Sequence, residues 1–362
     1  MYEFIVIGGG ISGLYFALKH GGNVLVLEKE GTLGGRAISI PFGDQNITIL
    51  PGAGIGIAAR DHTLIKLMVD LGFNYSTFWS DKNSDECQDM IKTLYDNMNN
   101  ITIHMTFLDY LNITLTEYQL DVFRKENGYT DHYTANALTT MLYYGLEDNC
   151  SRYLGISILW SKLIEAMSDK CDYKTNCEVL SVQGKYPHFR IITNNGTYST
   201  KNVVIATTIS SVRKLLNDPI YDIISSHPFM RVYASFNEQN TKIMREYFPK
   251  TIKTQNELHF IIPMSGNVWM LAYTDGEDAN LLHRKISKQL MEKYLYKTSK
   301  HKIEIQDMKV FYWKEGTHYY LPGKIDFDLI RNPEEGIYVV GEAVAKRQGW
   351  CNGALESVDE IL

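Results

Sequence analysis

The first residues of this sequence whose types and spacing could do chemistry form a glycine-rich segment near the N-terminus. Gly8, Gly10 and Gly13 fit the pattern GxGxxG, directly after a short apolar segment and directly before a segment with helical character. The first glycine permits a tight turn, the second lets the backbone approach a pyrophosphate, and the third lets the helix pack on the strand. The N-terminus of that helix, at Ser12, offers N–H groups and positive potential to phosphates. This pattern predicts a bound dinucleotide.

An acidic residue and an arginine extend the predicted cofactor site. Glu28 lies 20 residues after Gly8, where a carboxylate can accept hydrogen bonds from ribose hydroxyls. Gly34 and Gly35 allow a loop to close over the pyrophosphate, and Arg36 can offset its charge. A glycine-rich turn without a ligand is the alternative, but the strand, the helix and the acid together favour the dinucleotide.

The elements that must position these residues form a βαβ unit at the very N-terminus. Residues 2–7 and 23–27 are predicted strands, and the segment between them is a predicted helix. Elements of the same α/β type recur in the middle of the chain and at its end, separated by other material. We therefore expect an α/β fold in which a Rossmann-like domain is interleaved with a mixed α+β domain. The apolar patterns further predict helices over 134–144, 156–167, 278–295 and 352–362.

Composition excludes several classes of protein. The chain has 362 residues, of which 44% are hydrophobic and 22% charged, and this balance is typical of globular proteins. A single hydrophobic core rarely serves a chain of this length, so we expect two domains. Its net charge of −6 argues against nucleic acid as a partner and weakly favours cationic small molecules. It has neither an apolar run long enough for a membrane span nor a signal peptide, so we expect a cytoplasmic protein without a membrane partner. Five cysteines without CxxC or zinc spacing predict reduced thiols and no metal site.

The segment EKEGTLGGRA, residues 28–37, resembles the second flavin motif of the flavin-dependent amine oxidase superfamily, which includes monoamine, polyamine and L-amino acid oxidases. The resemblance implies FAD. It implies noncovalent FAD, because no cysteine lies at 310–320, where most relatives with a covalent flavin carry one. It also implies an FAD-binding domain built from 1–72, 154–222 and 323–362, and a substrate-binding domain built from 73–153 and 223–322.

Further segments resemble flavin motifs of this family, in the same order. Residues 51–54 resemble the loop that lies against the isoalloxazine, and Val179 resembles the residue whose backbone meets the adenine. Residues 338–343 are similar to the last flavin motif, in which Glu342 would meet the ribityl or pyrophosphate region. Residues 350–357 match the closing helix, whose N-terminus faces the pyrimidine end of the flavin. The resemblance therefore implies further cofactor contacts at Gly52, Ala53, Gly54, Gly341, Trp350, Gly353 and Ala354.

The resemblance also assigns aromatic residues to the reactive side. A neutral amine gives its α-hydrogen as hydride to flavin N5, so the protein mainly positions and desolvates the substrate. Trp350 stands where the family places one wall of an aromatic sandwich; its alternative role is packing of the last helix. The family's second aromatic position aligns with Gly316, which has no ring. Trp313, Tyr319 or Tyr320 could supply the missing aromatic wall, but each of them is equally a candidate core residue.

Two polar residues complete the predicted reactive side. His318 either contacts substrate or flavin, or makes a structural hydrogen bond. Arg231 stands where the family commonly has a lysine that holds a water on N5, but arginine stays charged and presents a planar fork. Three roles are open for Arg231: it stabilises anionic reduced flavin, it binds a substrate carboxylate, or it forms a salt bridge at the strand edge.

Together these features predict an FAD-dependent amine oxidase. Its substrate would be a small primary or secondary amine, and its products an imine, which hydrolyses to an aldehyde, and hydrogen peroxide from oxygen. A homodimer is left open. The alternatives are an L-amino acid oxidase or a desaturase on the same scaffold, and a protein that keeps flavin structurally without turning over an amine.

Overall fold

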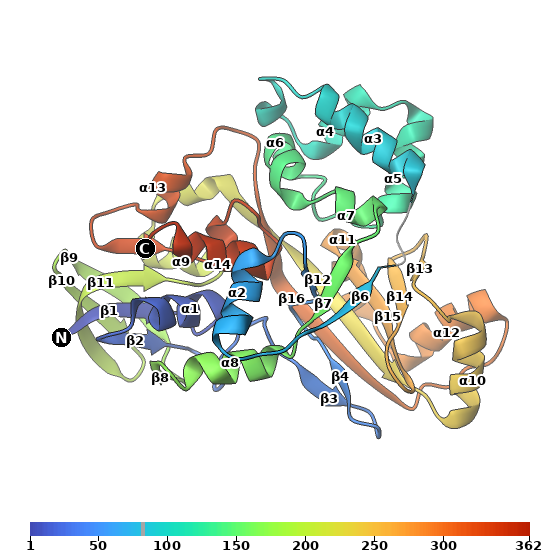
Figure 1. Ribbon diagram of the computed structural model, residues 1–362, viewed down its shortest axis with the longest axis horizontal. Coiled ribbons are helices and arrows are strands. Elements are labelled where there is room, and N and C mark those ends of the chain that lie inside the picture. Colours follow the sequence, from blue (N-terminus) through green and yellow to red (C-terminus); the bar gives the residue numbers. More distant parts are fainter. Residues whose placement is uncertain (81–83) are drawn as a thin grey trace.

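The computed structural model describes residues 1–80 and 84–362, and its N-terminal elements form the predicted βαβ unit. These elements are β1 (Tyr2–Ile7), α1 (Ile11–His20) and β2 (Val24–Leu27). Strand β1 pairs in parallel with β2 on one side and with β11 (Gly196–Ile205) on the other. The sheet has the order β8-β2-β1-β11-β10-β9, and β17 (Ile337–Val339) pairs with β11, so three distant chain segments share one sheet (Figure 1). Its other strands are β8 (Asp172–Lys174), β9 (Val179–Lys185) and β10 (His188–Thr193).

Helices cover both faces of this sheet because its central strands are apolar on both sides. Val6 and Val26 point to one face, whereas Ile5 and Leu25, their neighbours along the strands, point to the other. Parallel strands that are buried on both faces are typical of α/β domains. The helices on the first face are α1, α2 (His62–Asp70), α8 (Trp160–Ser168) and α14 (Cys351–Asp359), and α9 (Ile209–Leu216) lies on the second.

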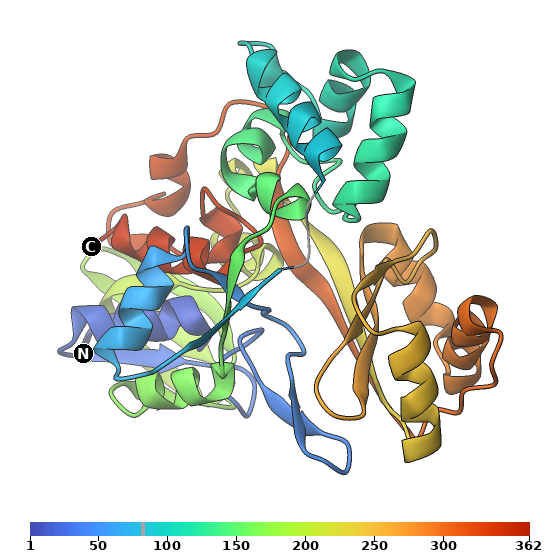
Figure 2. The ribbon, with the colours of Figure 1, turned by 45° about the vertical axis from the view of Figure 1, so that its right-hand side comes forward.

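A second sheet has the order β13-β14-β15-β12-β16 and forms the centre of the second domain (Figure 2). Met230 and Val232 on β12 pack into a core with helices α10 to α12. Arg231 and Tyr233 alternate with them and point to the opposite face, where both hydrogen-bond the carbonyl oxygen of Leu50. This face therefore meets the first domain. The elements are β12 (Ile224–Ser235), β13 (Ile252–Lys253), β14 (Phe260–Pro263), β15 (Val268–Asp275), β16 (Asp307–Tyr320), α10 (Glu238–Tyr247), α11 (Gly276–Lys285) and α12 (Lys288–Ser299).

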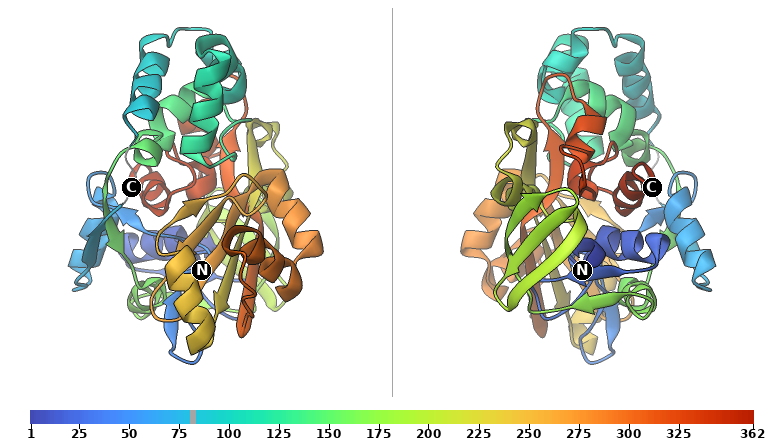
Figure 3. Two further views of the ribbon diagram at one scale, coloured as in Figure 1. Left: turned by 90° about the vertical axis from the view of Figure 1, so that its right-hand side faces the viewer. Right: turned by 90° about the vertical axis from the view of Figure 1, so that its left-hand side faces the viewer.

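A group of helices with its own apolar core stands above the two sheets (Figure 3). A disulfide between Cys87 and Cys150 joins its first helix to its last, across 63 residues. The prediction that all five cysteines are reduced thiols is therefore wrong for this pair, because sequence spacing does not reveal a contact that the helix packing creates. The group comprises α3 (Asp85–Asp96), α4 (Phe107–Thr114), α5 (Glu117–Asn127), α6 (Ala137–Thr139), η2 (Thr140–Tyr144) and α7 (Glu147–Cys150).

Several predicted helices differ from the observed ones. The helix predicted over 156–167 begins only at Trp160, because Leu154–Ser157 form strand β7, which pairs with β6 (Ser76–Trp79). The helix predicted over 278–295 is two helices, since the Ser287 hydroxyl accepts from the Leu290 N–H and starts α12. Among the described residues, no helix is long and apolar enough to cross a membrane.

Candidate active site

The turn between β1 and α1 depends on its glycines for two different reasons. Gly8 has a φ of +109°, and a Cβ built on it would lie 2.4 Å from the carbonyl oxygen of Ala206. A Cβ on Gly13 would lie 2.0 Å from the carbonyl oxygen of Gly8. A Cβ on Gly10 would meet none of the described atoms within 4 Å. Gly8 and Gly13 therefore serve the fold, whereas Gly10 keeps the end of α1 open to a ligand.

Helix α1 presents its N-terminus at this opening. No described side chain caps the helix, so its first N–H groups, including that of Ser12, are left for an anion. The loop at Gly34 and Gly35 lies alongside, and the Gly34 N–H donates to the Gly9 carbonyl at 2.8 Å. A Cβ on Gly341 would lie 3.4 Å from the Ser12 hydroxyl, so the C-terminal segment borders the same place. Three segments thus frame the predicted pyrophosphate position.

Glu28, the predicted ribose contact, lies beside the segment that leads into β9, which begins at the predicted adenine contact Val179. Glu28 is 8% exposed and accepts from the N–H groups of Gly9 (2.7 Å) and Glu30 (2.8 Å). A carboxylate has about four lone-pair positions, so two remain for hydroxyl groups. The Cys177 N–H donates to the Glu28 carbonyl at 2.8 Å, which brings the start of β9 beside Glu28.

A buried network joins Arg36, Glu342 and His318. Arg36 Nη2 lies 3.1 Å from Glu342 Oε2, and the His318 backbone N–H donates to Oε1 at 2.8 Å. The His318 ring donates from Nδ1 to Glu342 at 2.5 Å and accepts the Ile209 N–H at Nε2, at 3.2 Å. This assignment of the donor and acceptor nitrogens follows from the hydrogen-bond network. Both ring nitrogens are used inside the protein, as the structural alternative for His318 requires.

The same network keeps Glu342 ionised. Burial by itself would raise the pKa of Glu342, but the His318 ring, the Arg36 guanidinium and the hydrogen bonds it accepts hold it well below its usual range. Gly349 adds a fourth donor, through its N–H at 2.7 Å. Glu342 therefore fixes Arg36 and the turn that precedes α14.

The loop at residues 50–54 is held between the two domains. On the side of the first domain, the Ala53 N–H donates to the Arg36 carbonyl at 2.7 Å, and a Cβ on Gly52 would lie 2.3 Å from that oxygen. Elsewhere, four side chains donate to loop carbonyls, which makes them positioning residues for the predicted isoalloxazine contact. They are Trp313 (Nε1 to Pro51, 2.9 Å), Trp160 (Nε1 to Gly54, 2.8 Å), Arg231 (Nη1 to Leu50, 2.5 Å) and Tyr233 (hydroxyl to Leu50, 2.9 Å).

Trp350 is the N-cap residue of α14, and two arginine side chains lie near its ring. Its Nε1 donates to the Tyr144 carbonyl at 3.2 Å. The guanidinium carbons of Arg60 and Arg347 lie 5.3 Å and 5.0 Å from its ring centroid, which is within cation–π range. Arg347 is in turn paired with Asp61 at 2.9 Å. Trp350 thus connects α14, the helical group and two arginines; its role as a substrate wall stays a prediction.

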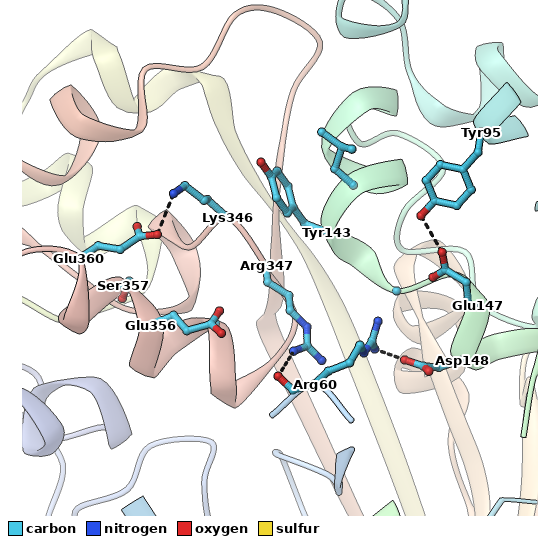
Figure 4. A pocket seen from close by; sticks show the side chains of 13 residues that line it. Arg60, Tyr95, Tyr143, Glu147, Asp148, Lys346, Arg347, Glu356, Ser357 and Glu360 are labelled. Carbon is cyan, nitrogen blue, oxygen red and sulfur yellow. Dashed lines mark hydrogen bonds and ion pairs between the residues drawn. The ribbon is translucent and has the colours of Figure 1, made fainter. Parts of the chain in front are cut away.

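A cavity of about 530 Å³ lies between α14 and the helical group, lined by Arg60 and Arg347 (Figure 4). Its volume is that of a small-molecule site. Many of its ionisable groups pair with one another, so it has no single dominant charge. The pairs are Arg60 with Asp148, Lys346 with Glu360 (2.8 Å) and Tyr95 with Glu147 (2.7 Å).

Phe229 fills the space of a side chain at position 316. A Cβ on Gly316 would lie 2.2 Å from Cδ1 of Phe229, and Gly316 does not have the positive φ that would itself require glycine. The Phe229 ring lies 6.4 Å from Trp313, centroid to centroid. The aromatic side chain next to Gly316, the predicted second wall position, is therefore Phe229 of β12. Tyr319 stacks on His227 at 4.2 Å, and Tyr320 is fully buried in the core.

We expect the substitution Gly316→Ala to destabilise the protein by about 1–3 kcal/mol, because the new methyl group overpacks against Phe229. In a Phe229→Ala background the same substitution should cost less, since the ring is gone. Urea unfolding of the two single variants and the double variant measures this coupling. Equal costs in both backgrounds would contradict the packing explanation.

Two carboxyl groups in the second domain, the buried Asp275 and the half-buried Asp131, escaped prediction because no motif marks them. Asp275, at the end of β15, accepts from the backbone N–H of Thr130 at 3.2 Å and from its hydroxyl. Asp131 accepts from the Tyr144 hydroxyl at 2.8 Å and lies 3.3 Å from His132 Nδ1. The two acids are far apart in sequence, and only the packing of the helical group on β15 brings them together.

Asp275 gives the protein a specific pH dependence. Burial, with the charge of Asp131, raises the pKa of Asp275 to about 7. A folded-state pKa above the unfolded one means that stability falls as pH rises from about 4 to about 7. Because an asparagine side chain cannot ionise, the variant Asp275→Asn should gain about 1–3 kcal/mol relative to the native chain between pH 5 and pH 8. Urea unfolding at both pH values checks this, and a constant difference would argue against it.

The residues at the domain border fit a bound dinucleotide. The uncapped end of α1 offers positive potential to a diphosphate, and Glu28 has acceptor positions for ribose hydroxyls. Within the described ranges, no group of three or more His, Cys, Asp or Glu side chains is placed to hold a metal ion.

Sequence comparison finds a family match for the N-terminal part of the chain. Residues 6–94 match the family described as NAD(P)-binding Rossmann-like domain. Over 73 residues the chain is 32% identical to the uncharacterized protein R188 of Acanthamoeba polyphaga mimivirus. This match covers 19% of the chain and 14% of the length of that relative.

Solved structures define the class of fold for nearly the whole chain. Cyclohexylamine oxidase from Brevibacterium oxydans IH-35A matches with a TM-score of 0.80 and 14% identity, over 99% of this chain and 97% of that one. A putrescine oxidase bound to putrescine matches with a TM-score of 0.79 and 14% identity, over 99% and 98%. The chain therefore has the two-domain α/β fold of these amine oxidases, which confirms the predicted fold class.

Proposed function

We propose that this chain is an FAD-dependent oxidoreductase that oxidises a C–N bond of a small amine. The product would be an imine that hydrolyses to an aldehyde, with oxygen as acceptor and hydrogen peroxide as the second product. The main support is that the glycine-rich β1–α1 turn meets four segments resembling flavin motifs at one domain border. These segments carry Arg36, loop 50–54, Glu342 and the N-terminus of α14. The fold shared with cyclohexylamine and putrescine oxidases supports an amine as substrate.

In this proposal the protein binds, orients and desolvates. FAD, held noncovalently, would supply the acceptor for the hydride. The first turn of α1 and Arg36 would hold its diphosphate, Glu28 its ribose, and loop 50–54 its ring system. Residues 73–153 and 223–322 would bind the amine, and the aromatic side chains on β12 and β16 would exclude water. An apolar surrounding lowers the pKa of an amine and so favours the neutral, reactive form.

The visible spectrum of the purified protein during anaerobic addition of amines tests this function. The panel runs from monoamines through polyamines to L-amino acids. We expect the ~450 nm flavin band to bleach with one substrate class, because the reduced cofactor reports its own hydride acceptance. A yellow protein that no amine bleaches would favour a structural flavin instead. A colourless protein that FAD does not reconstitute would refute the cofactor assignment.

Truncation of Trp350 tests the substrate wall. The variant Trp350→Leu should raise the amine concentration needed for half-maximal flavin reduction about tenfold, because an aromatic contact to the substrate is lost. Anaerobic flavin-reduction kinetics measure this, and FAD content serves as the control for an intact α14. Unchanged kinetics would refute the assignment of Trp350 as a wall.

A further inference from the structure

Arg231 is a buried cation without an anionic partner. Its side chain is 4% exposed, and no carboxylate of the residues described lies within ion-pair distance. Its neighbours are neutral. Nη1 donates to the carbonyl oxygens of Leu50 (2.5 Å) and Ala53 (3.4 Å). The guanidinium carbon Cζ lies 4.6 Å from the ring centroid of Tyr273 and 5.4 Å from that of Phe229. The salt bridge expected as one alternative is therefore absent from this part of the structure. A buried charge is costly unless it is paired, which points to an anionic ligand.

One nitrogen of the buried guanidinium group has no hydrogen-bond partner among the described residues. Nη1 is used by the two loop carbonyls, whereas Nε of Arg231 has no hydrogen-bond partner in the described chain. Nε and Nη2 form the edge that holds both oxygens of a carboxylate in a bidentate pair. Nη2 faces Gly54, where a Cβ would lie 3.5 Å away and where no side chain stands. A lysine would present a point charge here and could not make this fork.

We propose that the Nε–Nη2 edge of Arg231 binds the carboxylate of the substrate, which makes the substrate an α-amino acid or a similar carboxylated amine. This inference rests on the proposed oxidation of a C–N bond. The permanent charge of Arg231 repels an ammonium group, so the carboxylate end of such a substrate lies toward it and the amino end away from it. The aromatic rings of Tyr273 and Phe229 and the hydroxyl groups of Tyr273 and Tyr233 lie near the guanidinium but carry no negative charge, so a carboxylate would supply the missing anion.

Binding of an unreactive carboxylate tests the site without turnover. Isothermal titration of the FAD-loaded protein would compare 3-phenylpropionate, which has no amino group to oxidise, with the uncharged 3-phenylpropionamide. We expect the native protein to bind the carboxylate about 30-fold more tightly or better, since losing one partner of a buried charged pair has a large effect. Arg231→Gln should abolish this preference, and Arg231→Lys should keep part of it. Arg190→Gln, an exposed arginine on β10, is the matched control and should keep all of it.

The outcomes separate this proposal from its rivals. A native protein without preference for the carboxylate, or a preference that survives in Arg231→Gln, would overturn it. If Arg231→Gln does not fold, full retention of the preference in Arg231→Lys would overturn it as well, because a point charge cannot replace the fork. A shifted flavin midpoint potential with unchanged carboxylate binding would assign Arg231 to the cofactor instead.

A second comparison separates this inference from the proposed function itself. In the anaerobic assay, L-phenylalanine should bleach the flavin at lower concentration than phenethylamine, its decarboxylated counterpart. Bleaching by phenethylamine but not by L-phenylalanine would overturn the carboxylate site and leave the amine oxidase function standing. A flavin that no amine bleaches would refute that function, while the titration with 3-phenylpropionate still decides whether Arg231 binds carboxylates.

Discussion

Alanine at Gly13 is expected to destabilise the first domain by about 3 kcal/mol or more. The new methyl group would lie 2.0 Å from the carbonyl oxygen of Gly8, which is backbone and cannot turn away. Helix α1 would have to move off the turn, and its contacts with α8 and α14 would be lost with it. Loss of both unfolding free energy and FAD content is therefore the expected result.

Alanine at Gly10 is the matched control for this prediction. Its Cβ would meet no described atom within 4 Å, so the free energy of unfolding should change by about 1 kcal/mol or less. FAD content should nevertheless fall, because the methyl group stands where the backbone is predicted to meet the pyrophosphate. Urea unfolding and the flavin absorbance of the purified variants measure the two effects separately. Equal effects of the two alanines on stability would show that the glycines do not have these different roles.

Glu342→Ala should cost about 3–5 kcal/mol, because it leaves Arg36 and the donors on His318 and Gly349 without their buried acceptor. Glu342→Gln keeps the shape and should cost less at neutral pH. Glu335→Gln, at an exposed position, is the control and should change stability by about 0.5 kcal/mol or less.

The same carboxylate predicts the direction of a pH effect. The pKa of Glu342 is depressed in the folded protein, so its stabilisation is present above the unfolded pKa of about 4.3 and is lost as pH falls toward the folded value. The stability difference between the native chain and Glu342→Gln should therefore shrink between pH 6 and pH 3. Unfolding curves across this range test it, and a difference that grows on acidification would contradict the network.

The sequence alone determined the parts of this protein that depend on neighbouring residues. The order of apolar residues and glycines over residues 2–28 predicts a strand, a turn, a helix and a second strand, and the structure has all four. The recurrence of α/β segments along the chain predicts the interleaved fold. These features follow from local backbone conformation and short-range periodicity, which contiguous residues encode.

The tertiary structure decided which side chains meet across long distances. The pairing of β12 with β16 is irregular between His227 and Phe229, where Phe229 comes to lie against Gly316, and helix packing places Cys87 against Cys150. Such partners depend on strand register and domain packing, which no local pattern contains. Arg231 shows the division most clearly. The residue type alone indicates a permanent charge on a planar group. Only the folded chain shows that one of its nitrogens donates to two backbone carbonyls and that no described carboxylate lies beside it.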